Sequence, residues 1–210
     1  MTTYKEIFGK PVKHLSTDPT DAEAAGQIWY NSTSGTFKSI VASGAWSAGG
    51  NLGTGRYLVA GAGTQTAGLA FGGLSATPST NTNATEEYNG SGWSNGGDLS
   101  TTRRNLGGAG TQSAGLAFAG RTPSADTNTT EEYGGTSWTA GGNMGTARQA
   151  LAGAGTQTAG LGIAGYVTGT GFINTSEEYG GTSWTAGGTL AAAVGALAAE
   201  ESIETIVDHL

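Results

Sequence analysis

The chain contains no cysteine, and its 210 residues include only two histidines, two methionines and four prolines. Without cysteine there can be no disulfide bond and no thiolate metal site. The two histidines, His14 and His209, stand near opposite ends of the chain and do not have the spacing of metal ligands. We therefore expect no metal ion and no other cofactor.

Charged residues are also scarce, at 12% of the chain, and the formal net charge is −7. A nucleic-acid-binding protein neutralises phosphates with a basic patch, whereas Arg103 and Arg104 are the only adjacent basic pair here. There is no apolar run of the ~18 residues that suggests a membrane helix, and no apolar stretch near the N-terminus that resembles a signal peptide. We expect no nucleic-acid binding, no membrane insertion and synthesis in a cytoplasm.

Sequence motifs of common enzymes are missing. There is no GxSxG nucleophile elbow, no phosphate-binding P-loop and no HExxH zinc motif. An enzyme built from repeats would need one repeat to depart from the pattern with special residues, and none does. We expect no enzymatic activity.

The chain does contain a sequence unit that occurs three times. GAGTQ begins at Gly61, Gly108 and Gly153, and EEY begins at Glu86, Glu131 and Glu177. Intervals of 45 to 47 residues predict an array of repeats, each of which forms one small sheet. In the first repeat, strands are expected at residues 57–60, 68–72 and 85–88 and around Trp93. Four short strands per repeat are typical of a propeller blade, so the predicted fold is an all-β propeller.

Each repeat has a tyrosine and a tryptophan that stand five residues apart across a turn that contains glycine. We expect the two rings to meet across a hairpin and to pack between neighbouring blades. These predicted core residues are Trp46, Tyr88, Trp93, Tyr133, Trp138, Tyr179 and Trp184.

The order of residues within the repeat resembles the kelch repeat. The first unit reads Arg56, LAFGG at 69–73, EEY at 86–88, Trp93 and Leu99, and the next arginine follows at position 103. The double glycine is intact only in this unit, because the later repeats read FAG at 118–120 and IAG at 163–165. The match is therefore kelch-like.

A narrower resemblance covers about residues 20–190. The segments GTQTAGLAFGG, EEYNGSGW and QIWYNSTSGTFKS look like those of glycine-rich kelch-like virion proteins of marine and cyanobacterial tailed phages. The resemblance implies a structural role in a phage particle and contacts with other virion proteins. Propellers host many unrelated functions, so the fold by itself does not define the role.

The paired glutamates of each repeat could suggest a metal site. Adjacent side chains of a strand point to opposite faces, however, so two neighbouring carboxylates cannot converge on one ion. We expect instead that one glutamate of each repeat pairs with the arginine at the kelch position, between blades. The expected pairs join Arg56, Arg103 and Arg148 with Glu86, Glu131 and Glu177.

Incomplete repeats flank the three full ones. Residues 27–50 align with the second, third and fourth strands of a blade, at 27–31, 36–41 and 45–48, and residues 191–198 align with a first strand. We therefore predict about four blades in one chain, with N- and C-terminal strands sharing one blade. Such closure removes exposed sheet edges. The alternative is a ring completed by oligomerisation.

The predicted organisation has three parts. Residues 1–26 are expected to form an extended arm, residues 27–198 the propeller, and residues 199–210 a short helix or tail that contacts another subunit. The full repeats span about 55–100, 101–145 and 146–190.

The loops between the second and third strands vary most among the repeats, and variable loops on a constant scaffold often carry recognition. The candidate contact residues are Arg121, Asp126, Tyr166, Phe172 and Ile173. Together with the phage resemblance, these loops indicate a homo-oligomeric virion protein that presents them to a host glycan or protein. Such a protein could be a tail fibre, a tail adaptor or a capsid decoration protein. The alternative is a cellular or secreted propeller that binds carbohydrate or protein.

Overall fold

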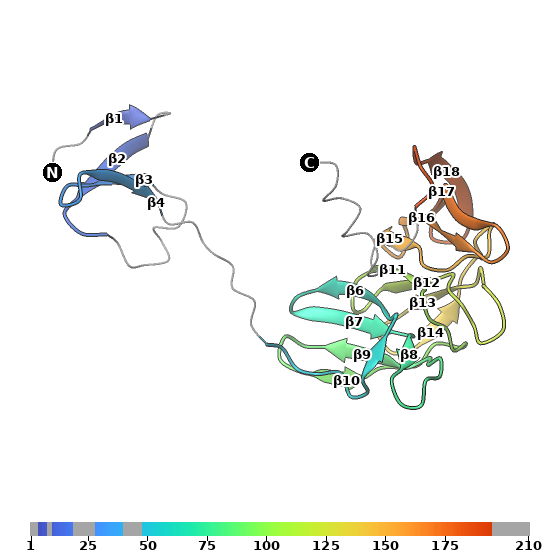
Figure 1. The fold of residues 1–210 in the computed structure, drawn as a ribbon. Helices are drawn as coiled ribbons and strands as arrows, with labels where there is room; N and C mark the ends of the chain where they lie inside the picture. The colour runs from blue at the N-terminus through green and yellow to red at the C-terminus, as the bar shows by residue number, and fades with distance from the viewer. Residues whose placement is uncertain (1–3, 8–9, 19–27, 40–47, 195–210) are drawn as a thin grey trace. The chain divides into compact units, whose positions relative to one another are not determined.

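A computed structural model describes residues 4–7, 10–18, 28–39 and 48–194. The chain divides into two compact units, Met1–Ala48 and Gly49–Leu210 (Figure 1). Within the described ranges the regular elements are all β-strands, and no helix there could span a membrane.

The N-terminal unit is a four-stranded sheet in the order β1-β2-β3-β4. Its strands are β1 (Tyr4–Ile7), β2 (Lys10–Leu15), β3 (Ile28–Asn31) and β4 (Thr36–Ser39). β2 and β3 run parallel, and the other two pairs run antiparallel.

Asp18 links the elements of this small unit. Its carboxylate accepts hydrogen bonds from Trp29 Nε1 at 3.0 Å, Asn31 Nδ2 at 2.6 Å and Lys38 Nζ at 2.6 Å. Trp29 is buried with 3% of its surface exposed. The donors, Lys38 first, lower the pKa of Asp18 to about 2.

One prediction for the N-terminal region is wrong, and a second is not tested by the described residues. Residues 1–26 were expected to form an extended arm, but they contain β1 and β2. A C-terminal strand was expected beside residues 27–31, but β2 takes that place by pairing with β3. β2 therefore occupies the edge of β3 on which the shared blade was predicted, and residues 195–198 of that blade lie outside the described residues.

Some predicted elements lie outside the described residues. Trp46 is one, and of the fourth strand expected at 45–48 only Ala48 is described, outside any strand. Residues 195–198 of the shared blade and the tail at 199–210 also lie outside the description.

In the second unit, each full repeat folds into one four-stranded antiparallel sheet. The first sheet contains β6 (Ala60–Thr64), β7 (Ala67–Phe71), β9 (Thr85–Tyr88) and β10 (Trp93–Asn95). The second contains β11 (Gly107–Gly110), β12 (Gly115–Phe118), β13 (Thr130–Tyr133) and β14 (Trp138–Ala140). The third contains β15 (Ala152–Gly155), β16 (Gly160–Val167), β17 (Gly171–Tyr179) and β18 (Trp184–Thr189). A small ribbon of β5 (Arg56–Tyr57) and β8 (Leu74–Ser75) accompanies the first sheet.

The first strands of successive sheets, β6, β11 and β15, contact one another (Figure 1). They approach so closely that only glycine fits at the contact. A Cβ on Gly108 would lie 2.7 Å from the carbonyl oxygen of Gly61, and one on Gly153 would lie 2.3 Å from that of Gly108. The GAGTQ glycines therefore set the spacing of the sheets.

Large apolar side chains pack between the sheets. Phe71 of the first sheet meets Trp138 of the second at a ring distance of 4.9 Å, and Phe118 of the second meets Trp184 of the third at 4.8 Å. Phe71 and Phe118 are fully buried. The sheets thus stack face to face around two equivalent hydrophobic layers, each worth roughly 1.5–3 kcal/mol per large buried side chain.

Candidate functional site

The three arginine–glutamate pairs are present, and they lie in equivalent places. The arginine stands on the segment that enters each sheet, and its guanidinium reaches the glutamate on that sheet's third strand. Arg56 lies 3.1 Å from Glu86, Arg103 lies 2.9 Å from Glu131, and Arg148 is paired with Glu177. All three arginine side chains are fully buried.

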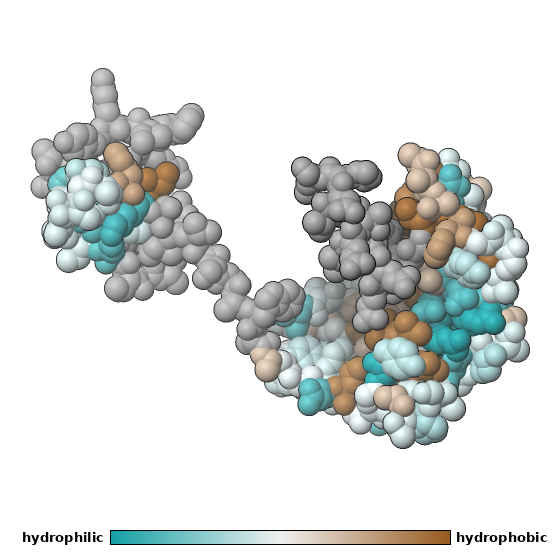
Figure 2. Space-filling model, in the orientation of Figure 1, coloured by the Kyte–Doolittle hydropathy of each residue, from teal (hydrophilic) through white to brown (hydrophobic). Residues whose placement is uncertain are grey.

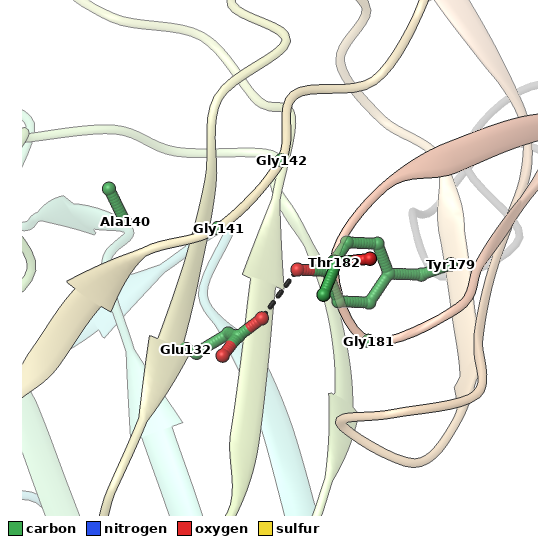
Figure 3. A pocket seen from close by; sticks show the side chains of 7 residues that line it. All are labelled: Glu132, Ala140, Gly141, Gly142, Tyr179, Gly181 and Thr182. Carbon is green, nitrogen blue, oxygen red and sulfur yellow. Dashed lines mark hydrogen bonds between the residues drawn. The ribbon is translucent and has the colours of Figure 1, made fainter.

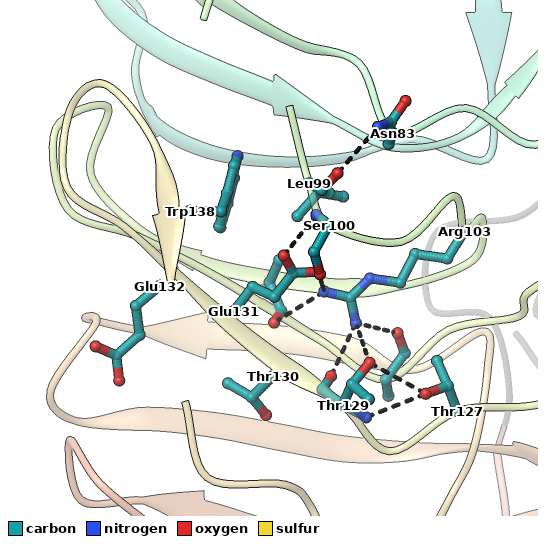
Figure 4. Close-up of polar contacts among 12 residues, drawn as sticks. Asn83, Leu99, Ser100, Arg103, Thr127, Thr129, Thr130, Glu131, Glu132 and Trp138 are labelled. Carbon is teal, nitrogen blue, oxygen red and sulfur yellow. Dashed lines mark hydrogen bonds and ion pairs between the residues drawn. The ribbon is translucent and has the colours of Figure 1, made fainter. Parts of the chain in front are cut away.

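Backbone oxygens complete each arginine site. Arg103 Nη1 donates to the carbonyl oxygens of Ala119 at 2.9 Å and Thr129 at 2.8 Å, while Glu131 also accepts from the Ser100 amide at 2.7 Å (Figure 4). Burial lowers the pKa of the Arg103 guanidinium, and Glu131 opposes that shift. Each arginine therefore bonds groups of its own repeat and holds the segment that enters the sheet against that sheet.

The second glutamate of each triplet has a different partner, which the sequence did not reveal. Glu87 accepts a hydrogen bond from the hydroxyl of Tyr133 in the next sheet, and Glu132 accepts one from Tyr179. Burial, reinforced by these carboxylates, raises the pKa of both tyrosines to about 12. The two adjacent glutamates therefore point to opposite faces of each sheet, as adjacent side chains of a β-strand do.

The tyrosine and tryptophan of each repeat face each other across their hairpin. Tyr133 pairs in register with Trp138, and their ring centroids are 5.0 Å apart. The other two pairs, Tyr88 with Trp93 and Tyr179 with Trp184, have the same arrangement.

A hollow of about 270 Å³ opens between the second and third sheets. It is lined by Glu132, Tyr179, Ala140, Thr182 and glycines 141, 142 and 181, with the Tyr179–Glu132 hydrogen bond at its centre (Figure 3). The carboxylate of Glu132 and the phenol of Tyr179 bond each other, so the hollow is a by-product of the contact between sheets. No group of three or more His, Asp or Glu residues suited to a metal occurs among the described residues.

A second polar group lies where the loops between second and third strands meet the segments that connect the sheets. We call it the loop-end cluster; it consists of Asn81, Arg104, Asn105, Arg121, Asp126, Gln149 and Thr168. Arg104 Nη1 donates to Asn81 Oδ1 at 2.6 Å, and Asn105 Nδ2 donates to Gln149 Oε1 at 3.2 Å. The cluster therefore spans residues of all three repeats.

Asp126 is the acceptor at the centre of this cluster. It pairs with Arg121 at 2.8 Å and accepts from Gln149 Nε2 at 3.1 Å and from the Thr168 amide at 2.7 Å. Burial alone would raise the pKa of Asp126, but the Thr168 amide and Arg121 outweigh it, and the pKa lies below its ordinary value. Two of the predicted contact residues, Arg121 and Asp126, thus bond each other and the neighbouring loop.

The other three predicted contact residues stand on the long hairpin of the third sheet. The rings of Tyr166 and Phe172 meet edge to face at 5.3 Å, and Phe172 is 55% exposed while Ile173 is half-buried. Hydrophobic surface is visible over the part of the third sheet where β17 and β18 lie (Figure 2). The hairpin therefore offers an aromatic surface beside the loop-end cluster.

The backbone under the loop-end cluster is the same in each repeat. Leu58, Asn105 and Ala150 occupy one repeat position, and their φ angles are 55°, 53° and 52°. Their amides continue a backbone ladder, from Asn105 to the Leu58 carbonyl and from Ala150 to the Asn105 carbonyl. Side chains at this end differ while the backbone does not.

Comparison with known proteins identifies no family. No protein-family model and no curated protein matches the chain. A solved structure, entitled "Structure of YjhT", matches with a TM-score of 0.57 and 12% sequence identity over 77% of this chain and 51% of that one. The chain thus spans about half the length of that protein. At this identity the likeness concerns the fold alone, and the four-stranded antiparallel sheets are consistent with a propeller-like architecture.

Proposed function

We propose that this chain is a non-enzymatic structural protein of a tailed-phage virion, built from kelch-like propeller blades, that presents the loop-end cluster for binding. The role in the particle would be that of a tail fibre, a tail adaptor or a capsid decoration protein. The proposed partners are other virion proteins and a glycan or protein on the host surface. The phage assignment rests on the sequence resemblance.

One observation supports the binding role. The side chains at the loop end differ between repeats, whereas the backbone that bears them has the same conformation in each repeat. Tyr57, Arg104 and Gln149 each follow the buried arginine of their repeat, and together they offer a phenol, a guanidinium and an amide. A rigid scaffold with variable polar and aromatic groups at one end suits recognition.

Location in the particle tests the virion role. Protein composition and immunogold labelling of purified particles are expected to find the chain on the head, collar or fibre. Its absence from purified virions would overturn the assignment.

Substitution tests the binding surface separately. Arg104→Ala and Gln149→Ala are expected to weaken adsorption to host cells at least ~10-fold, by loss of a charged and a neutral polar contact. Ser113→Ala is the matched control, because Ser113 is exposed in the turn between β11 and β12, at the other end of the second sheet. Equal adsorption by all three variants would exclude the loop-end cluster as the binding surface.

The alternative is a cellular or secreted module that binds carbohydrate or protein. The observation that favours it is the exposed Phe172 beside amide and guanidinium groups, a chemistry that serves sugar recognition in any setting. A genomic neighbourhood without capsid and tail genes would favour this alternative.

A further inference from the structure

The two internal contacts between sheets use the same set of side chains. The later sheet contributes a tryptophan, a tyrosine and the glutamine of GAGTQ. In the second contact, Trp184 Nε1 donates to Thr130 Oγ1 at 2.9 Å, and Gln157 Nε2 donates to the carbonyl oxygens of Gly115 at 3.1 Å and Tyr133 at 2.8 Å. Trp138 and Gln112 make the equivalent bonds in the first contact, to Thr85, Gly68 and Tyr88.

Among the residues that the structure describes, the third sheet presents one half of this contact without the other half. We call the face with Leu161, Ile163, Ser176 and Glu178 the trailing face. Leu161 and Ile163 are only half-buried there, whereas the equivalent Leu116 and Phe118 are fully buried by the third sheet. Glu178 is exposed, whereas Glu132 at the same repeat position binds Tyr179.

The first sheet presents the other half. We call the face with Gln65, Gly68, Tyr88 and Trp93 the leading face. Gln65 is exposed, and Tyr88 is half-buried while Tyr133 and Tyr179 are 0% and 2% exposed. Trp93 Nε1 donates to the carbonyl oxygen of Gly50 at 3.0 Å, whereas its counterparts bond a hydroxyl of the preceding sheet.

We propose that two copies of this chain pack head to tail, the trailing face of each on the leading face of the other. Trp93 of one copy would donate to Ser176 of the other, Tyr88 to Glu178, and Gln65 to the carbonyl oxygens of Gly160 and Tyr179. Each copy has one face of each kind, so two identical contacts close the assembly. Two copies supply twice the three repeat sheets of one chain, within the usual range of ~4–8 blades.

In this arrangement, the other copy displaces the segment that precedes the first sheet. Gly49 and Gly50 lie against Tyr88 and the turn of Ser91, as Gly141 and Gly142 lie against Tyr179 and the turn of Thr182. In the sequence, Gly187 and Gly188 hold the same repeat position at the end of the third sheet. The Gly187–Gly188 pair of one copy would therefore replace Gly49–Gly50 of the other.

A second copy fits the trailing face better than the chain's own ends do. The sheet of the N-terminal unit contains the parallel pair β2–β3, whereas the repeat sheets are antiparallel throughout. In the sequence, Ala199 and Glu201 stand where Gly153 and Gly155 stand one repeat earlier. β6 has the glycines that close approach requires, as does each later repeat.

The mass of the full-length protein in solution tests the proposal. Sedimentation across a dilution series is expected to give twice the 20.8 kDa chain mass. Ile163→Asp and Glu178→Lys, both on the trailing face, are expected to raise the dimer dissociation constant at least ~30-fold with unchanged circular dichroism. Ser113→Lys, in an exposed turn away from both faces, is the control and is expected to remain dimeric.

Cross-linking identifies the faces, because the chain has no cysteine of its own. Trp93→Cys with Ser176→Cys is expected to cross-link into a species of double mass, whereas Thr130→Cys with Trp184→Cys, a pair within one chain, keeps the single mass. A monomer at every concentration, with the trailing face covered by the chain's own terminal residues, would overturn the proposal. A dimer that is unaffected by Ile163→Asp and Glu178→Lys would overturn it as well.

Discussion

At the scale of single residues, each EEY triplet divides its three side chains between two contacts. Glu131 binds the buried arginine that enters its own sheet, Glu132 binds a tyrosine of the next sheet, and Tyr133 binds the glutamate of the preceding one. Three adjacent residues thus join three successive layers, because strand geometry turns alternate side chains to opposite faces.

The tyrosine–glutamate bonds predict an alkaline transition. The pKa of Tyr179 is raised from 10.0 to about 12, so its contribution to stability is complete below pH 10.0 and is lost as the pH rises through about 12. Tyr179→Phe is expected to lower the melting temperature at neutral pH and to remove one late step from the tyrosinate absorbance titration. Tyr57→Phe serves as the control, because Tyr57 is 49% exposed and has no carboxylate partner among the described residues. An unchanged titration in Tyr179→Phe would contradict the assignment.

The glycine contact predicts a steric effect. Gly153→Ala would place a Cβ 2.3 Å from the Gly108 carbonyl oxygen, so we expect a loss of about 1–3 kcal/mol in the free energy of unfolding. Gly180→Ala is the matched control, since its Cβ would meet nothing closer than 4.0 Å. Denaturant unfolding measures the stability of both variants. Equal free energies of unfolding would show that the strands can move apart without loss of stability.

At the scale of elements, the buried ion pair holds the segment that enters the second sheet against that sheet. Arg103→Met leaves Glu131 as an unpaired buried charge, so we expect a loss of about 3–5 kcal/mol, partly recovered in the double variant Arg103→Met/Glu131→Gln. Lys38→Met is the control, because the side chains of Lys38 and Asp18 are 38% and 42% exposed and an ion pair this exposed contributes little to stability. Unchanged melting of Arg103→Met would rule out this role.

The hairpin of β3 and β4 predicts an acid transition of its own. The pKa of Asp18 is lowered from 3.8 to about 2, so its stabilising effect is complete above pH 3.8 and is lost as the pH falls through about 2. Asp18→Asn is expected to loosen the hairpin already at neutral pH. The indole N–H resonance of Trp29 reports both changes, and a resonance that does not move between neutral pH and pH 2 would contradict the proposed hydrogen bond.

The repeat elements were predictable because their signals recur at a fixed interval. The strands around Tyr88 and Trp93, and the arginine–glutamate pairing, follow from the repeat and the strand period. β2 was missed because Pro11 and the acidic stretch after Pro19 indicated a loop, and its pairing with β3 joins residues distant in sequence. The bonds from Gln112 and Gln157 to carbonyl oxygens were also missed, because nothing in a sequence marks a side chain that bonds backbone.

At the scale of the whole molecule, position in the array should govern local stability. Among the three repeat sheets, the second has a neighbouring sheet on both faces, whereas the first and third each have one on a single face. In the Ile163→Asp variant, hydrogen exchange is therefore expected to be slowest in β11 to β13 and faster in β15 to β17. In the proposed wild-type assembly, the difference in exchange rate between β11–β13 and β15–β17 is expected to be smaller. If wild type and Ile163→Asp show the same exchange rates, the trailing face is not covered in the wild type.

The shared backbone beneath the loop-end cluster has a consequence for how such a protein changes over generations. The amide of Gly73 bonds the carbonyl of Arg103, that of Gly120 bonds Arg148, and that of Gly165 bonds Val194, whatever loop follows. Because equivalent backbone hydrogen bonds hold each loop, a loop from one repeat can replace a loop in another. A lineage can therefore alter the surface at this end of the sheets by recombining its own repeats, without having to find a new fold.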